Sequence, residues 1–330
     1  MDYTRREFTK LALTAAPALG LMGEPAFGSA LAQGKPNSLF NGVQIGAITY
    51  GYRQMPDQSA EATLKYVLDS GISAIELMDG PAETFAGRPS AGRGGAGRGR
   101  GVPPTPEQQA EQRAAQQAAQ AALKAWRTSV SMDKYKALRK MYNDAGVSIY
   151  AVKILSPNMS DEEFEYVFNV AEALGCTHTT LELPTDEAQL KRIGDFAMKR
   201  KIYAAYHTHT QGSMTAFDRA FVLSPGNMAN VDLGHYVAAG NVGGTPVEFL
   251  EKHHARISSI HLKDRKSKEN GGDNVPWGTG DTPIRDILQT MKKRQWKFPA
   301  SIEVEYRIPE GSDAVAEVKK CVQFCADALA

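Results

Sequence analysis

Short apolar runs in the second half of the chain each end in residues that bind metals or transfer protons. A helix-length amphipathic stretch separates each of these ends from the next, and the ends lie at residues 180–184, 206–209, 231–235, 260–264 and 302–306. A strand followed by a helix, repeated with the reactive side chain at the carboxyl end of the strand, is typical of a (β/α)8 barrel enzyme. The sequence therefore predicts an α/β fold, a TIM barrel, whose functional residues meet at one mouth.

The composition fits one such barrel. The chain has 330 residues, of which 42% are hydrophobic and 23% charged, so it can bury a large core. A formal net charge of +1 favours a small, uncharged or modestly charged substrate over nucleic acid or an anionic membrane, although the charge alone excludes no class. The three cysteines do not have the spacing of a disulfide framework or a zinc ribbon, so we expect buried free thiols.

The first 32 residues have the features of a twin-arginine signal peptide. A twin-arginine motif at residues 4–10 precedes a moderately apolar stretch at 11–22 and a small-x-small cleavage pattern at 30–32. Pro17 and Gly20 interrupt the apolar stretch, which is shorter than the ~20 residues of a membrane span, so no stable membrane anchor is expected. The sequence predicts export to the periplasm through the twin-arginine machinery, which carries folded proteins. The alternative is a chance pair of arginines ahead of a disordered terminus.

Residues 33–330 are expected to form a single TIM-barrel domain. Apolar periodicity and the positions of Gly and Pro predict its strands at 43–50, 74–79, 148–155, 177–183, 202–207, 230–232, 257–262 and 301–306. The same signals predict its helices at 59–70, 134–144, 161–174, 186–200, 216–223, 246–254, 283–294 and 312–329.

An insertion of about residues 82–125 follows the second predicted strand. Residues 86–101 are built almost wholly of Gly, Arg, Ala, Ser and Pro, which indicates a flexible loop, and residues 105–124 are rich in Gln, Ala and Glu, which indicates a polar helix. A loop after a barrel strand lies on the active-site face, so the insertion is expected to cover part of the mouth. Binding of single-stranded nucleic acid is disfavoured, because the tract has few repeats and no interleaved aromatic residues.

Strand periodicity places pairs of reactive side chains on one side of the barrel wall. His207 shares a side with His209, Glu303 with Glu305, and His261 with Lys263. Unpaired charges in a buried lumen cost several kcal/mol each, and a bound divalent cation compensates them. Mixed imidazole and carboxylate ligands fit Mn²⁺, Co²⁺, Zn²⁺ or Fe²⁺ better than Ca²⁺. Any one of these histidines alone is as consistent with a satisfied core residue.

These segments resemble the xylose-isomerase-like barrels grouped as sugar phosphate isomerases/epimerases, which include ketose 3-epimerases, inosose dehydratase and, more distantly, apurinic-site endonucleases. The most specific pieces are residues 206–209, 232–235, 261–264 and Glu303, and the resemblance runs from residue 43 to the C-terminus outside the insertion. It implies one divalent metal held by His207, where many members have Glu, and by Asp232, His261 and Glu303. Glu182 is the candidate for a further metal ligand or the catalytic base.

The resemblance also implies a mechanism and a substrate site. The metal would chelate a hydroxyl and an adjacent carbonyl of a sugar, Glu182 and Glu303 would move protons, and Lys263 would stabilise the enediolate oxygen. His235 resembles the family's substrate-binding histidine. Further candidates for substrate binding are His209, Lys153, Trp277 and Arg307, for several of which a place in the solvated or packed rim is an equal alternative.

Three other functions remain open at this point. An exported lyase acting on 3-keto-glycosides would use the same intermediate with a leaving group at the β carbon, and the export signal favours it. A phosphodiesterase like the endonucleases would need histidines from the early strands, which the sequence lacks. A non-catalytic sugar-binding barrel would not need both Glu182 and Glu303. A homo-oligomer is compatible with the sequence.

Overall fold

Eight parallel strands close into a barrel at the centre of the protein. The computed structural model describes residues 34–89 and 105–330, so the predicted signal peptide lies outside the described residues. The barrel strands are β2 (Val43–Ile48), β3 (Ala74–Met78), β4 (Ser148–Lys153), β5 (His178–Glu182), β6 (Tyr203–His207), β7 (Asn227–Asp232), β8 (Ile257–Leu262) and β9 (Ala300–Ile302). Each strand pairs with the next, and β2 pairs with β9 to close the ring, which confirms the predicted TIM barrel.

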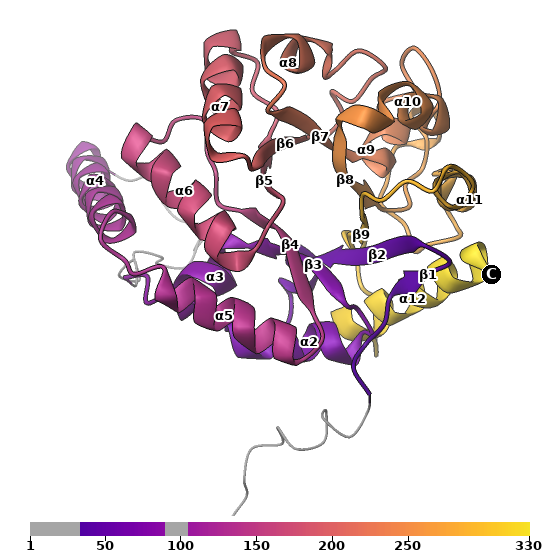
Figure 1. Ribbon diagram of the computed structural model, residues 1–330, viewed down its shortest axis with the longest axis horizontal. Helices are drawn as coiled ribbons and strands as arrows, with labels where there is room; N and C mark the ends of the chain where they lie inside the picture. Colours follow the sequence, from indigo (N-terminus) through magenta and orange to yellow (C-terminus); the bar gives the residue numbers. More distant parts are fainter. Residues whose placement is uncertain (1–33, 90–104) are drawn as a thin grey trace, which may run out of the picture. The chain divides into compact units, whose positions relative to one another are not determined.

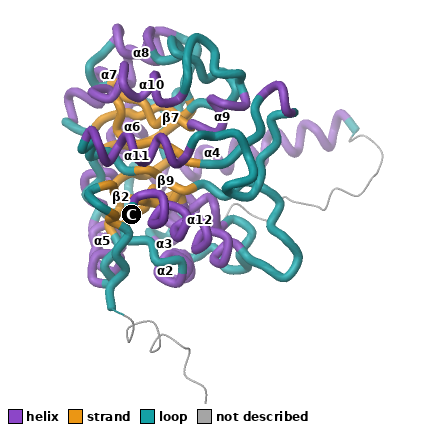
Figure 2. The backbone as a smooth tube through the Cα atoms, turned by 90° about the vertical axis from the view of Figure 1, so that its right-hand side faces the viewer, coloured by secondary structure: helices purple, strands orange, loops and turns teal. Residues whose placement is uncertain are grey.

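Helices surround this barrel on the outside (Figures 1 and 2). They are α2 (Ala60–Asp69), α3 (Asp79–Phe85), α4 (Pro106–Arg127), α5 (Asp133–Asp144), α6 (Asp161–Leu174), α7 (Glu187–Arg200), α8 (Asp218–Leu223), α9 (Leu233–Ala238), α10 (Pro246–His253), α11 (Ile284–Arg294) and α12 (Ala314–Leu329), with 3-10 turns at Thr49–Tyr52, His254–Arg256 and Lys268–Asn270. Among residues 34–89 and 105–330, no helix is both long and apolar enough to cross a membrane. The three cysteines are buried free thiols, as predicted.

The structure adds short elements to the predicted pattern. The hairpin strand β1 (Leu39–Phe40), α3 and α9 were not predicted, because each is too short to show a period in sequence. The last strand was predicted to run to residue 306 but ends at Ile302. The Glu303 N–H still donates to the carbonyl of Leu262 at 3.0 Å, so pairing continues one residue past the strand.

Alternation along β5 shows how the strands separate the core from the lumen. Leu181 belongs to the apolar core between barrel and helices. Its neighbour Thr180 points the other way and donates a hydrogen bond to Glu76 of β3, at 2.6 Å. His178, on the same side as Thr180, contacts Ser259 of β8 at 3.0 Å. Every second residue therefore faces a polar lumen, and the last such position of β5 is Glu182, at the mouth.

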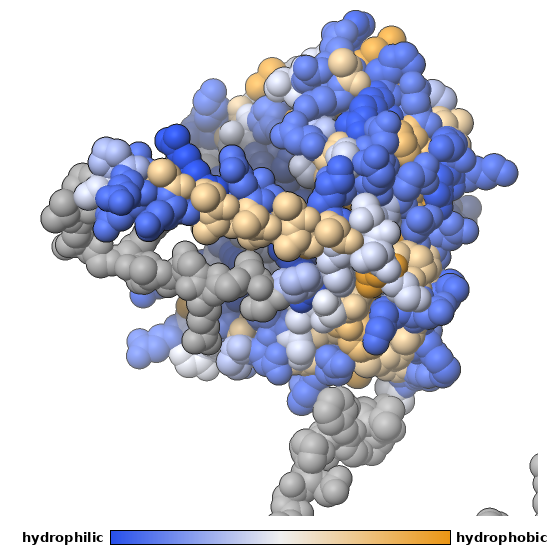
Figure 3. Space-filling model, turned by 90° about the vertical axis from the view of Figure 1, so that its left-hand side faces the viewer, coloured by the Kyte–Doolittle hydropathy of each residue, from blue (hydrophilic) through white to orange (hydrophobic). Residues whose placement is uncertain are grey.

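The predicted polar helix of the insertion is present as α4. Thr105 caps it through a capping box with Gln108. Apart from Arg127 at its end, whose side chain is 9% exposed, the helix is largely open to solvent, and Figure 3 shows it projecting from the protein with a row of mildly apolar side chains along one side. In Figure 1 it lies at the edge of the molecule beyond α6 and not over the barrel centre. Most of the predicted Gly/Arg loop falls at residues 90–104, outside the described residues.

One buried carboxylate holds both ends of this insertion. Glu83 of α3 is fully buried and accepts hydrogen bonds from Arg88, at 3.0 Å, and from Arg127 at the end of α4, at 2.9 Å. The Tyr166 hydroxyl of α6 donates to the same carboxylate at 3.0 Å. Both ends of the insertion are therefore bound to one acidic residue.

We expect Glu83→Ala to destabilise the protein by roughly 3–5 kcal/mol, because it removes the buried carboxylate that pairs with Arg127 and Tyr166 and leaves Arg127 with Glu163 alone. Urea unfolding followed by circular dichroism measures the loss. Glu162→Ala is the matched control, since Glu162 of α6 also pairs with a residue of α4, Lys124 at 3.4 Å, but is 66% exposed. That change should cost far less than Glu83→Ala, because solvent screens an exposed ion pair. Equal effects of the two substitutions would mean that Glu83 does not anchor the insertion.

Candidate metal centre

Four side chains that can bind metal meet at the carboxyl ends of neighbouring strands. His207 ends β6, Asp232 ends β7, His261 lies near the end of β8 and Glu303 follows β9. All four are buried, and their ligand atoms lie within 4.8 Å of one another. The structure therefore brings together four of the five residues that were predicted as metal ligands.

Two atoms of this group have no hydrogen-bond partner in the described protein. His207 Nδ1 is buried without a partner, and Asp232 Oδ2 is buried with only an ion pair to Lys263 Nζ, at 3.1 Å. Buried polar atoms are rarely left unpaired, and each such atom costs free energy. A divalent cation would satisfy both atoms at once. Two imidazoles and two carboxylates suit Mn²⁺, Fe²⁺, Co²⁺ or Zn²⁺, so the residues fit the expected ion.

Glu76 of β3 lies behind His261 and was not predicted as a site residue. Its Oε2 is 2.7 Å from His261 Nε2, while His261 Nδ1 is 2.9 Å from Glu303 Oε2. Thr180 and Asn230 donate to the Glu76 carboxylate, at 2.6 and 3.1 Å. A carboxylate on one ring nitrogen fixes the tautomer and orientation of a histidine that binds metal through the other. Glu76 therefore positions His261.

The electrostatics of the group follow from burial and from these pairings. Burial alone would lower the pKa of His261, but Glu76 and Glu303 outweigh it and raise the pKa to about 10. Burial alone would raise the pKa of Glu76, but His261 lowers it to about 2. Burial, together with the charge of His261, holds the pKa of His207 well below its usual value. His207 is thus a neutral imidazole, the form that binds metals, whereas His261 would have to give up its Nδ1 proton to bind an ion.

Lys263 places a buried ammonium beside the four possible metal ligands. Its side chain is 2% exposed, and its Nζ lies 3.1 Å from Asp232 Oδ2, 3.0 Å from Glu303 Oε2 and 2.5 Å from Glu305 Oε2. Burial alone would lower the pKa of Lys263, but these carboxylates outweigh it and raise the pKa above its usual value. Lys263 therefore remains charged across the physiological range.

Glu182 lies at the mouth, outside the group of four. Its carboxylate accepts a hydrogen bond from Lys153 Nζ at 2.7 Å and lies 3.3 Å from His209 Nδ1. The side chain is 48% exposed. It therefore joins neither group of possible ligands in the described part of the chain. Lys153 and His209, two predicted substrate-binding residues, instead hold it at the open edge of the site.

His235 and Arg307, two further predicted substrate-binding residues, lie in different places. His235 follows Asp232 in α9 and is buried, with Nε2 3.1 Å from Lys263 Nζ and Nδ1 in contact with Arg265. Burial, with the charges of Lys263 and Arg265, lowers the pKa of His235 to about 2, so it is neutral. Arg307 is exposed, and none of the polar contacts within residues 34–89 and 105–330 joins it to the group.

Trp277 packs against the rim of the barrel. Its ring meets Phe324 of α12 edge to face, with centroids 5.7 Å apart. The surrounding loop is fixed by Asp264, whose carboxylate accepts from the backbone N–H groups of Gly278 and Gly280, each at 2.8 Å. A Cβ at position 280 would lie 2.1 Å from Asp264 Oδ1, so only glycine fits there. This arrangement favours packing over sugar stacking for Trp277.

Comparisons with known proteins agree with the barrel fold. The family model described as "Xylose isomerase-like TIM barrel" matches residues 64–325. No curated protein matches the chain.

Solved structures of the same fold cover most of the chain at low sequence identity. A xylose isomerase domain protein from Planctomyces limnophilus is 16% identical, with 87% of this chain and 96% of that chain covered and a TM-score of 0.56. The probable 3-DHS dehydratase AsbF from Bacillus anthracis is 14% identical, with 85% and 98% covered and a TM-score of 0.58. The 3-keto-D-glucoside 4-epimerase YcjR from E. coli, in its apo form, is 10% identical, with 86% and 100% covered and a TM-score of 0.56. At these identities the likeness shows the shared fold.

Proposed function

Because the chain belongs to the xylose isomerase-like TIM barrel family, we propose that it is a divalent-metal-dependent sugar isomerase or epimerase acting through an enediolate on a keto- or aldo-sugar. The observation that carries the proposal is the buried group of His207, Asp232, His261 and Glu303, in which His207 Nδ1 and Asp232 Oδ2 have no hydrogen-bond partner. A buried site of this kind is costly unless it holds a cation.

The four residues would hold Mn²⁺, Co²⁺, Zn²⁺ or Fe²⁺. An ion held there would polarise the hydroxyl and carbonyl oxygens of the sugar and acidify the carbon between them. Glu182, oriented by Lys153, would take the proton from that carbon. Glu303 lies on a strand across the barrel, where it would return the proton on the other side of the sugar plane. The ammonium of Lys263 supplies positive charge beside the developing enediolate oxygen.

The rim residues would orient the sugar. His235 is neutral and buried, and His209 is half-exposed beside Glu182, so both would bind substrate hydroxyls. A phosphodiesterase of the endonuclease kind fits less well, because β3 and β4 contribute Glu76 and Lys153 to the lumen where that class needs histidines.

A lyase that acts on 3-keto-glycosides is the second candidate. The same deprotonation next to a carbonyl expels a glycosidic oxygen when that oxygen lies on the β carbon, so no further residue is needed. The observation that favours it is the export motif at Arg5 and Arg6, because sugar phosphates are scarce outside the cytoplasm.

Proton NMR in D₂O with a panel of keto-sugars and 3-keto-glycosides separates these candidates. An isomerase or epimerase should place deuterium on the carbon next to the carbonyl and keep the glycosidic bond. A lyase should release the aglycone and leave an unsaturated keto-sugar. Binding of sugars without exchange, turnover or bound metal would support a non-catalytic barrel and contradict the proposal.

Export is tested separately from catalysis. We expect Arg5→Lys with Arg6→Lys to leave the protein in the cytoplasm with its signal uncut, because the twin-arginine machinery recognises the arginine pair itself. Cell fractionation and the mass of the product measure both effects. Lys10→Arg, which keeps the pair, should be exported and cleaved as usual. Periplasmic, processed protein from the double variant would show that another pathway exports the chain.

A further inference from the structure

The ammonium of Lys263 is surrounded in the way that a metal ion is. Four acceptor atoms on different residues lie within 3.1 Å of its Nζ: Asp232 Oδ2, Glu303 Oε2, Glu305 Oε2 and His235 Nε2. The three carboxylates carry more charge than one ammonium balances. This nitrogen thus lies in a buried shell of oxygen and imidazole ligands, the donor set of transition-metal sites.

Two members of this shell also belong to the metal group. Asp232 and Glu303 contribute oxygens to the four-residue group and contact Lys263 at the same time. In two-metal enzymes, ions about 3.5–4 Å apart sit side by side in one cluster of ligands. Lys263 Nζ shares two ligands with the four-residue group, as a second ion in such a pair would, and its other two contacts are Glu305 and His235.

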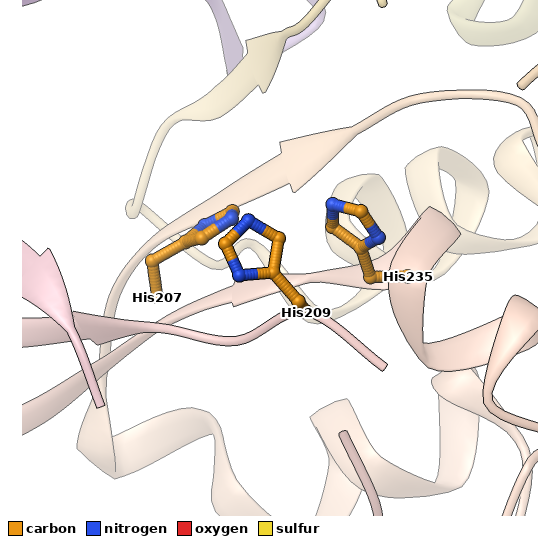
Figure 4. Close-up of side chains that lie close together, drawn as sticks. All are labelled: His207, His209 and His235. Carbon is orange, nitrogen blue, oxygen red and sulfur yellow. The ribbon is translucent and has the colours of Figure 1, made fainter. Parts of the chain in front are cut away.

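A second group of possible ligands lies beside the ammonium. His207, His209 and His235 offer nitrogens within 4.8 Å of one another, and Figure 4 shows the three rings side by side. The ring centroids of His209 and His235 are 4.7 Å apart. His235 Nε2, however, faces Lys263 Nζ at 3.1 Å, so a cation at this group would meet the ammonium charge. Lys263 thereby opposes a metal ion at these histidines.

We infer that Lys263 occupies the position of a second divalent cation and keeps the centre mononuclear. Removal of its charge leaves Asp232, Glu303 and Glu305 with one negative charge more than a single divalent ion balances, which favours binding of a second cation. The inference rests on the proposed metal centre and is independent of which sugar reaction the enzyme performs. Lys263 acts here as a positioning residue, because it sets how many ions the ligands can hold.

The test counts metal ions in purified full-length variants. Wild type and Lys263→Met are stripped with chelator, incubated with Mn²⁺ and dialysed, and bound metal is measured by elemental analysis. Wild type should hold one equivalent and Lys263→Met a second one, because methionine has a similar length without the charge. Mn²⁺ electron paramagnetic resonance should show an exchange-coupled pair in the variant only.

Matched variants separate this role from a purely structural one. Lys153→Met removes an ammonium group that contacts Glu182 and not Asp232 or Glu303. This variant should still bind one equivalent of Mn²⁺. Lys263→Arg keeps the charge and should also stay at one. Lys263→Met combined with Glu305→Gln should lose the second equivalent. A lost contact alone would reduce metal content or stability and would not add an ion.

Every outcome of this test either supports or contradicts the inference about Lys263. One equivalent in both wild type and folded Lys263→Met overturns the inference while leaving the proposed function intact. No metal in wild type overturns the proposed function itself. If Lys263→Met folds only with metal, refolding with Mn²⁺ should give soluble protein with the second equivalent. Failure to fold even with excess Mn²⁺ would assign Lys263 a structural role and contradict the inference.

Discussion

Asp232→Ala and Asp232→Asn are both expected to lose nearly all bound metal and the activity with it. Asp232 is fully buried, and its Oδ2 is one of the two atoms of the group without a hydrogen-bond partner. Loss of a residue that only supports a ligand costs about 10–100-fold in metal affinity, and loss of a charged ligand should cost more. Elemental analysis after dialysis and activity assays with added Mn²⁺ measure the two effects.

The pair of variants also separates metal binding from helix capping. Asp232 caps α9 by accepting a hydrogen bond from the His235 N–H at 2.6 Å. Asparagine keeps this acceptor and alanine does not, so only alanine should add a loss of about 1 kcal/mol from the missing cap. Asp313→Ala is the control, because Asp313 caps α12 at 2.8 Å in the same way but lies outside the ligand group. It should keep its metal. Full metal content and activity in Asp232→Asn would remove Asp232 from the centre.

Melting temperatures should follow the ion. A ligand that binds only the folded state adds about 4 kcal/mol of stability at a thousandfold excess over its dissociation constant. Chelator should therefore lower the melting temperature of wild type and of Asp313→Ala. In Asp232→Asn the same chelator should change nothing, since little metal remains to be removed.

Glu182→Gln is expected to lower turnover by about 10² or more while metal content stays at the wild-type level. Glutamine keeps the size of the side chain and can still accept from Lys153, but it cannot take a proton. The carboxylate lies outside the group of four, so its loss should not release the ion. Steady-state kinetics and elemental analysis on the same preparation measure both quantities.

Deuterium exchange tests independently whether Glu182 is the catalytic base. In D₂O, wild type should label the carbon next to the substrate carbonyl, and Glu182→Gln should not. Glu187→Gln is the control, because Glu187 is an exposed carboxylate on α7 at the same rim and pairs with Arg219. Its turnover should equal that of wild type. Loss of metal together with activity in Glu182→Gln would make Glu182 a ligand, and unchanged turnover with unchanged metal would exclude it from the mechanism.

The barrel could be predicted from the alternation of strands and helices, and the family resemblance implied the four ligands. A reactive residue at the end of a parallel strand must lie at one mouth, so His207, Asp232 and His261 converge whatever the loops do. Glu303 converges although β9 is shorter than predicted, because its backbone still pairs with Leu262. Strand geometry thus explains why the residues that the resemblance implied lie together.

The remaining parts of the site depend on contacts between distant strands. Glu76 is a lone carboxylate in an apolar strand, and its role needs His261, 185 residues away, to be placed beside it. That inward-facing charge between Ile75 and Leu77 was the one available signal. Glu182 has the parity of a ligand, but its pairing with Lys153, from the neighbouring strand, directs it to the rim. Sequence spacing contains no information about such pairings.

Glu83 binds both ends of the insertion, so the length of the insertion can change without moving the barrel strands. Closing a chain segment into a loop costs conformational entropy. Each doubling of the segment's length raises the free-energy cost of closure by only about 0.6 kcal/mol. The segment between Arg88 and Arg127 can therefore lengthen, shorten or change composition at little thermodynamic cost to the barrel. Selection can act on that segment independently, while the strands that carry the metal ligands keep their register.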